Sequence, residues 1–162
     1  MNTRRATRGA AAGAAAAILW ALQQPLDKRV LGSRYDDVEL LGKLVTRGPA
    51  WRATGLAMHA ANGAAFGATF ALARPHFPGS PLAQAVTAAM AENFAFWPLG
   101  RLIDRLHPAR RELEPLTGNR RALAQATWRH LVFGVALGLL EPPLNRGSVP
   151  SSQRPATTGR EQ

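Results

Sequence analysis

The sequence predicts an all-α protein, a bundle of four transmembrane helices built from two tandem helix–loop–helix units. Three observations predict this fold. Four segments of the chain carry almost no charge, polar connections separate them, and each has a tryptophan near one end. A helix needs about 20 largely apolar residues to cross the hydrocarbon layer of a bilayer, and the four segments are long enough to do so.

The four predicted spans lie in one membrane domain, residues 1–141, and cover residues 9–26, 53–73, 81–100 and 122–141. Alanine and glycine dominate them, so each helix is only weakly hydrophobic and we expect the helices to depend on one another. The alternative is a soluble, alanine-rich bundle. Residues 142–162 are rich in proline and serine, and we expect a disordered polar tail because such a composition cannot build a core.

Charge and composition narrow the classes of function. The formal net charge is +10 and cysteine is absent, which excludes disulfides and thiolate chemistry. The basic residues flank the apolar segments and have no aromatic stacking platform among them, so we expect a membrane surface as partner and no nucleic acid.

Two long connections, residues 27–52 and 101–121, separate the spans within each unit. In each of them the spacing of apolar and charged residues predicts a short amphipathic helix that lies in the membrane interface. Each connection carries six lysine and arginine residues. Basic residues tend to stay on the cytoplasmic side, so we expect a multi-pass protein of the bacterial inner membrane whose long connections are cytoplasmic.

The tryptophans come late in the first and third spans and at the start of the second and fourth. With four crossings, all four indoles would lie on the same side of the membrane. Because indole rings favour the headgroup layer, we expect four interface anchors. These anchors are Trp20, Trp51, Trp97 and Trp128.

A repeated motif supports the two-unit architecture. His59-x3-Gly63-x3-Gly67 in the second span matches His130-x3-Gly134-x3-Gly138 in the fourth, 71 residues later. Residues four apart share one face of a helix, and small residues on that face allow close helix contact. The same spacing occurs in the other two spans. The glycines predicted to pack helices are Gly9, Gly13, Gly63, Gly67, Gly134 and Gly138.

Glu92 lies at the centre of the third span and is followed by Asn93. A carboxylate in the middle of a bilayer is costly and usually faces the bundle interior with a partner or its proton. By depth, the candidate partners are Asn62, His59 and His130. This polar set either fixes the helices by hydrogen bonding or forms a proton or ion pathway.

A metal or haem held between the two histidines is a further alternative, but the spacing lacks any known ligand signature, so we expect neither metal nor cofactor. Arg129, beside His130, would be costly deep in lipid. It either reaches the tryptophan-rich side, or lies before the true start of the fourth span, or pairs with Glu92.

The glycine-rich first helix with Pro25, together with the two His-x3-Gly-x3-Gly motifs, resembles the small bacterial inner-membrane proteins of the YagU-like kind. The resemblance implies a polytopic membrane protein without an assigned catalytic activity, and it transfers no site residues. We therefore expect a non-enzymatic scaffold, accessory or envelope component, whose partners are the bilayer and either a second copy or another membrane protein. The alternatives are a small transporter or channel subunit that uses Glu92 and the histidines, and then a membrane enzyme.

Overall fold

The computed structural model describes residues 2–145, and every regular element in that range is helical. The elements are α1 (Asn2–Leu31), α2 (Asp37–Val45), α3 (Trp51–Ala73), α4 (Pro81–Phe96), α5 (Gly100–Leu106) and α6 (Arg120–Asn145), with 3-10 turns at Arg74–His76 and Trp97–Leu99. The prediction of an all-α protein is confirmed.

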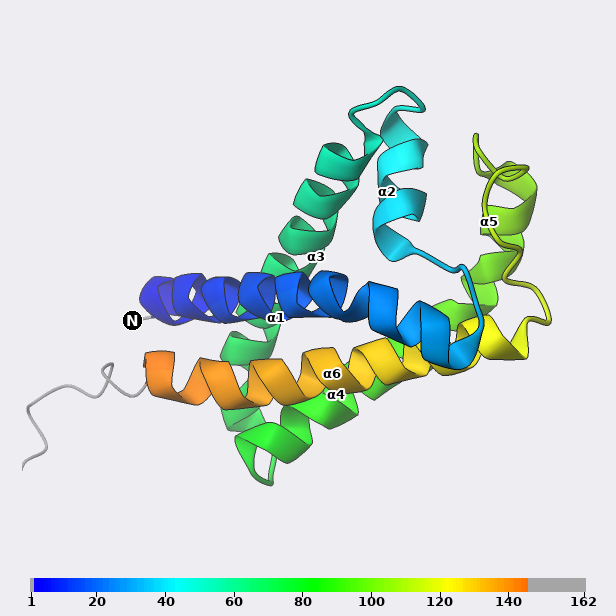
Figure 1. The fold of residues 1–162 in the computed structure, drawn as a ribbon. Coiled ribbons are helices and arrows are strands. Elements are labelled where there is room, and N and C mark those ends of the chain that lie inside the picture. The colour runs from blue at the N-terminus through cyan, green and yellow to red at the C-terminus, as the bar shows by residue number, and fades with distance from the viewer. Residues whose placement is uncertain (1, 146–162) are drawn as a thin grey trace, which may run out of the picture.

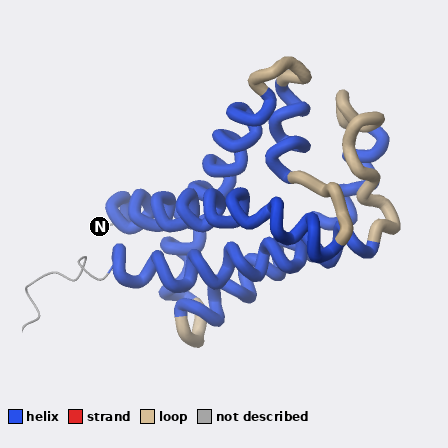
Figure 2. The backbone as a smooth tube through the Cα atoms, viewed as in Figure 1, coloured by secondary structure: helices blue, strands red, loops and turns tan. Residues whose placement is uncertain are grey.

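The long helices form two units in chain order, α1 with α3 and α4 with α6, and each unit has a short helix in its connection. Helices α1 and α6 run side by side, with the start of α1 next to the end of α6 (Figure 1). Helix α3 crosses α1, α4 packs on α6, and α2 lies against the first half of α3. The loops gather at the ends of the helices (Figure 2).

Local sequence explains where several helices begin and end. Helix α1 contains a run of alanines, and alanine has the highest helix propensity of all residues. The helix stops before Gly32, whose φ of 62° lies in the left-handed region. The Asp36 side chain caps α2 by accepting a hydrogen bond from the Glu39 N–H at 2.9 Å. Ser80 caps α4 in the same way, directly before Pro81.

Glycine contacts hold α1 against α3. A Cβ atom placed on Gly13 would overlap the carbonyl oxygen of Gly63, and one on Gly67 would overlap that of Gly9. All four glycines are buried. The two backbones therefore touch directly, which is the contact that the four-residue spacing predicts.

The second unit uses a related contact between α4 and α6. A Cβ atom on Gly134 would lie 2.8 Å from the Cα of Val86, and one on Gly138 would lie 2.8 Å from the Cα of Leu82. Here alanines at 85 and 89 provide the opposing small residues. A third close approach, between Gly42 and the start of α3, seats α2 on its neighbour.

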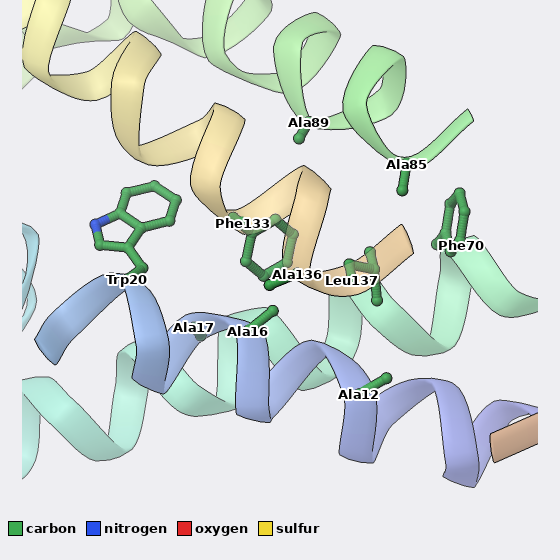
Figure 3. Close-up of a cluster of buried hydrophobic side chains, with 10 residues drawn as sticks. All are labelled: Ala12, Ala16, Ala17, Trp20, Phe70, Ala85, Ala89, Phe133, Ala136 and Leu137. Atoms are coloured by element: carbon green, nitrogen blue, oxygen red, sulfur yellow. The ribbon is translucent and has the colours of Figure 1, made fainter. Parts of the chain in front are cut away.

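Small residues also dominate the apolar core (Figure 3). Alanines from α1 and α4 face the central helix α6, and the larger side chains among them are one tryptophan, two phenylalanines and a leucine. The core residues are Ala12, Ala16, Ala17, Trp20, Phe70, Ala85, Ala89, Phe133, Ala136 and Leu137. Most packing contacts in this core therefore come from helix backbones that lie close together, and few come from large side chains.

Three predicted boundaries are corrected. The first helix runs from Asn2 to Leu31 and continues through Pro25, whereas the predicted span was residues 9–26. The α-helix of the third span ends at Phe96, because Pro98 cannot donate a backbone hydrogen bond and the chain tightens into a 3-10 turn. Helix α6 extends to Asn145 through two prolines, past the predicted end at residue 141. The rest of the predicted tail lies outside the described residues.

Within residues 2–145, α6 is the one helix that is long and apolar enough to cross a membrane. A buried helix in a soluble protein would meet the same criterion. Helix α4 has only 16 residues, and polar residues such as His59 and Asn62 interrupt the apolar sequence of α3. The helical class is confirmed, whereas the four predicted membrane spans are not, because α6 alone among the described helices meets the criterion.

The glycine contact between α1 and α3 yields a stability prediction. Gly67→Leu should lower the free energy of unfolding by about 1–3 kcal/mol or more, because the new side chain must displace the α1 backbone. Reversible unfolding in detergent micelles measures the change. Ala61→Leu, at an exposed position of the same helix, is the matched control and should unfold like the wild type. Equal stability of the Gly67 variant and wild type would contradict the contact.

Candidate functional site

A cavity of about 190 Å³ lies between α1, α2, α3, α4 and α6, and we refer to it as the histidine cavity. Its polar lining includes His59 and Asn62 from α3, Glu92 from α4 and His130 from α6. Four of the five residues of the predicted polar site therefore meet around one space. The rest of the lining is mostly apolar and comprises Ala17, Trp20, Asp37, Leu40, Leu41, Gly63, Phe66 and Phe133.

Asn93, the fifth predicted residue, is not among the residues that line this cavity. It is buried, and its Nδ2 donates a hydrogen bond to Thr127 Oγ1 at 3.0 Å. Neighbouring residues on a helix point about 100° apart, so Asn93 is turned away from the histidine cavity that Glu92 lines. Asn93 joins α4 to α6.

Trp20 separates the two histidines. Its ring centroid lies 4.9 Å from that of His59 and 4.6 Å from that of His130, with both histidines in edge contact. The indole N–H donates a hydrogen bond to Asp37 Oδ2 at 3.1 Å, and the side chain is only 6% exposed. The prediction that Trp20 is an interface anchor is wrong, because its polar group is satisfied by a carboxylate inside the bundle.

The other three tryptophans keep some exposure. Trp128 is exposed and donates its N–H to Gln23 Oε1 at 3.1 Å. Trp97 contacts Tyr35 edge-on, with ring centroids 6.4 Å apart. Trp51 is half-buried at the start of α3. These positions are compatible with an interface, and the anchor role of these three residues stays a prediction.

The protonation state of His130 follows partly from its contacts. Its Nδ1 lies 2.8 Å from the Ala126 carbonyl oxygen, which can only accept, so Nδ1 carries a hydrogen. Its Nε2 faces Glu92 Oε2 at 3.7 Å, slightly beyond hydrogen-bond distance. Either group can hold a proton between them, because the imidazole nitrogen and the carboxylate oxygen both accept one.

His59 has unsatisfied hydrogen-bonding capacity. The side chain is 6% exposed, and its Nε2 is buried without a hydrogen-bond partner. A buried polar atom without a partner is destabilising, and native proteins keep few of them. The free nitrogen therefore gives this cavity a polar site that no protein group occupies.

A second cavity of about 230 Å³ adjoins the same pair of residues. Glu92 and His130 line it together with Asn93, Tyr35 and Trp97, among others. The Glu92–His130 pair therefore borders two separate cavities. The side chain of Glu92 is 40% exposed, which fits a position between them.

Arg129 is the centre of a charge cluster next to the histidine cavity. It has no exposed surface, and its guanidinium binds both oxygens of Asp27, with Nε at 2.7 Å and Nη2 at 2.8 Å. Its Nη1 donates to Asp37 Oδ2 at 2.7 Å, and Nη2 also reaches the carbonyl oxygen of Tyr35 at 3.1 Å. Gln125 adds a hydrogen bond to Asp27 at 2.5 Å.

None of the three arrangements predicted for Arg129 occurs. It neither reaches the surface, nor lies before α6, nor pairs with Glu92, because two carboxylates from α1 and α2 neutralise it inside the bundle. The sequence did contain a signal for this pairing. Arg129 is the one Lys, Arg, Asp or Glu residue between Ala122 and Leu140, and Asp27 directly follows the first span, so charge balance pointed to that carboxylate.

The charge cluster also shifts two pKa values. Burial raises the pKa of Asp37, but the charge of Arg129 and the hydrogen bond from the Tyr35 hydroxyl more than offset it, and the pKa lies below its ordinary value. Burial and the nearby Asp37 carboxylate raise the pKa of Tyr35 well above its ordinary value. Asp37 is therefore ionised and Tyr35 neutral at pH 7.

A second buried charge lies at the opposite end of α6. Glu141 is fully buried, and its Oε2 is 3.0 Å from Arg74 Nε, which is ion-pair distance although the two groups are not aligned for a hydrogen bond. Asn145 donates to the other oxygen at 2.8 Å. Sequence reasoning missed this pair because Glu141 was placed at the end of the last span.

Within residues 2–145, no group of three or more histidine, aspartate or glutamate side chains is placed to hold a metal ion. Comparison of the chain with protein-family models, with curated proteins and with solved structures gives no match. The resemblance to the YagU-like proteins therefore stays a sequence-based prediction.

The charge cluster yields the second prediction. Arg129→Met should lower the free energy of unfolding by about 3–5 kcal/mol, because Asp27 and Asp37 would remain buried without their cation. Unfolding in detergent micelles measures the loss, and Arg110→Met, at an exposed loop position, is the control. Arg129→Lys should recover only part of the loss, since an ammonium group cannot bind both carboxylates in a fork. Wild-type stability of Arg129→Met would show that the cluster does not hold the fold.

Proposed function

We propose that this chain is a non-enzymatic integral membrane protein with a scaffold or accessory role, whose helices α1, α3, α4 and α6 cross the bacterial inner membrane. One observation carries the proposal: large apolar side chains face outward along the helices at three- and four-residue spacing. On α1 and α6 these include Leu19, Leu22, Leu26, Leu131, Val135, Leu139 and Leu140.

The degree of exposure supports lipid as the surrounding medium. Leu22 is 72% exposed and Leu139 is 59% exposed. A soluble monomer rarely exposes contiguous apolar patches of more than a few hundred Å². In a bilayer such stripes contact acyl chains at no cost, so this surface suits a lipid environment.

The weak hydropathy of the separate helices is compatible with this proposal. Helix association in a membrane depends on van der Waals packing, and small residues allow the backbones to approach closely. The glycine contacts of α1 with α3 and of α4 with α6 supply such packing. The helices would thus be stable in the bilayer as packed units.

The basic long connections support a cytoplasmic location for α2 and α5. The outward apolar stripes would also accept a second copy or another membrane protein, which is the kind of partner that an accessory role requires. The resemblance to the YagU-like proteins favours the same proposal.

The membrane location yields the third prediction. After expression in a bacterial host, the protein should stay in the membrane pellet through a sodium carbonate wash, because spanning helices resist extraction at high pH. Immunoblotting of pellet and supernatant measures the distribution, with a peripheral membrane protein as the control that is released. Recovery as a monodisperse species in the supernatant would overturn the proposal.

A second candidate function is proton or ion handling by Glu92 and the histidines. The specific observation in its favour is the position of the Glu92–His130 pair between two cavities, with the unpartnered His59 nitrogen on one side. A carboxylate and an imidazole that face each other at 3.7 Å can pass one proton between them. The chain would then be a small transporter or channel subunit.

Replacement of the carboxylate separates the two functions. If Glu92 handles protons, wild-type proteoliposomes should show a proton flux that Glu92→Gln abolishes, because an amide cannot exchange the proton while it keeps much of the hydrogen bonding. A pH-sensitive dye inside the vesicles measures the flux. Glu112→Gln, at an exposed site in a loop, is the control and should retain it. Absence of flux from the wild type would reject the second candidate and leave the scaffold role.

A further inference from the structure

An apolar groove that shares no lining residue with the histidine cavity lies between the second half of α1 and the first residues of α2 and α3. Its volume is about 500 Å³, within the range of about 300–1,000 Å³ that is usual for small-molecule sites. Most of its lining is apolar, with Ile18, Leu22 and Pro25 on α1 and Leu56 on α3. Trp51 lies among the lining residues at the start of α3.

The charged residues of this groove leave one positive charge in excess. Lys28 pairs with Asp36, whose other carboxylate oxygen caps α2. Arg52 is the remaining charge, and within the described part of the chain no carboxylate lies within ion-pair distance of it. Its guanidinium is exposed and lies over the Trp51 ring, 5.2 Å from the ring centroid.

A buried polar group points to a ligand in the same groove. Gln24 lines it and is only 5% exposed, yet its Nε2 has no hydrogen-bond partner. An unpaired buried amide is destabilising unless something binds it. The groove therefore combines an apolar wall, one uncompensated cation and one unused hydrogen-bonding group.

We propose that this groove binds one anionic phospholipid. An acyl chain lies along the apolar wall, and the phosphate diester, with its single negative charge, binds Arg52 and the amide of Gln24. The indole of Trp51 sits at headgroup level, where such rings are favoured. This inference rests on the proposed membrane location and names the lipid class that the protein selects there.

The charge balance favours an anionic lipid over a zwitterionic one. A phosphatidylglycerol headgroup carries one net negative charge and matches the one excess positive charge of the groove. A phosphatidylcholine headgroup has no net charge and adds a bulky cation beside Lys28 and Arg52. The groove also borders the basic connection at residues 27–52, where anionic lipids of the cytoplasmic leaflet would collect.

Native mass spectrometry of the purified full chain in mild detergent tests the proposal. With phosphatidylglycerol and phosphatidylcholine of identical acyl chains added in equal amounts, the wild type should retain one phosphatidylglycerol in preference. Arg52→Gln should weaken that retention about fivefold, which is the effect of one cation near an anionic surface. Arg101→Gln, at an exposed site on α5, is the control and should bind like the wild type.

Gln24→Leu supplies a second variant, which keeps every charge, removes the amide and should also weaken retention. Equal retention of the two lipids by the wild type, or equal loss in Arg52→Gln and Arg101→Gln, would overturn the proposal. Displacement of the lipid by millimolar inorganic phosphate would overturn it as well, since the groove would then be a free phosphate site. Because binding is read on purified protein, its failure is distinct from release of the protein in the carbonate wash.

Discussion

A buried arginine on α6 fixes the end of α1 and the start of α2 within the bundle. Arg129 has no contact with solvent, so its charge has to be neutralised by residues that come to it. Asp27 arrives from the end of α1 and Asp37 from the start of α2, which fixes both elements against α6. Asp37 also accepts the indole N–H of Trp20, and Trp20 contacts both histidines of the cavity. The geometry of the histidine cavity therefore depends on the ion pairs of Arg129.

The repeated motif explains how one tryptophan contacts two histidines. In each unit the histidine lies four residues before a glycine that packs against a neighbouring helix, so the histidine sits at the edge of a close helix contact. Helix α1 packs on both α3 and α6, and Trp20 on α1 therefore meets His59 on one side and His130 on the other. The two units differ in charge, because only the second carries Arg129 and Glu92. The repeat thus gives both units the same histidine–glycine pattern, while the packing and the charges of the two units differ.

The helices and their glycine contacts could be predicted from the sequence. Small residues spaced four apart lie on one face of a helix, and that face allows a neighbouring backbone to approach closely. The grouping of Glu92 with Asn62 and the histidines followed from depth along the helices. Two features could not be predicted in this way. The position of a tryptophan near a helix end does not reveal whether it faces lipid or core, and Trp20 faces the core because Asp37, from a connection, satisfies its N–H. The extension of α6 through Pro142 and Pro143 was also missed, since proline normally ends a helix.

Arg129 and His130 are neighbours on α6, but their surroundings differ: Arg129 is enclosed by carboxylates and His130 borders two cavities. The cation of Arg129 is held by two carboxylates at hydrogen-bond distance, so its charge is fixed and its role is structural. The adjacent His130 instead faces Glu92 across 3.7 Å, beside two cavities and with Glu92 partly exposed. A purely structural carboxylate would be closed in by donors, as Asp27 is by Arg129, Gln125 and Gln23. Glu92 thus differs from Asp27 in having few donors around it, so its replacement, rather than that of the Arg129 cluster, tests the proton-handling hypothesis.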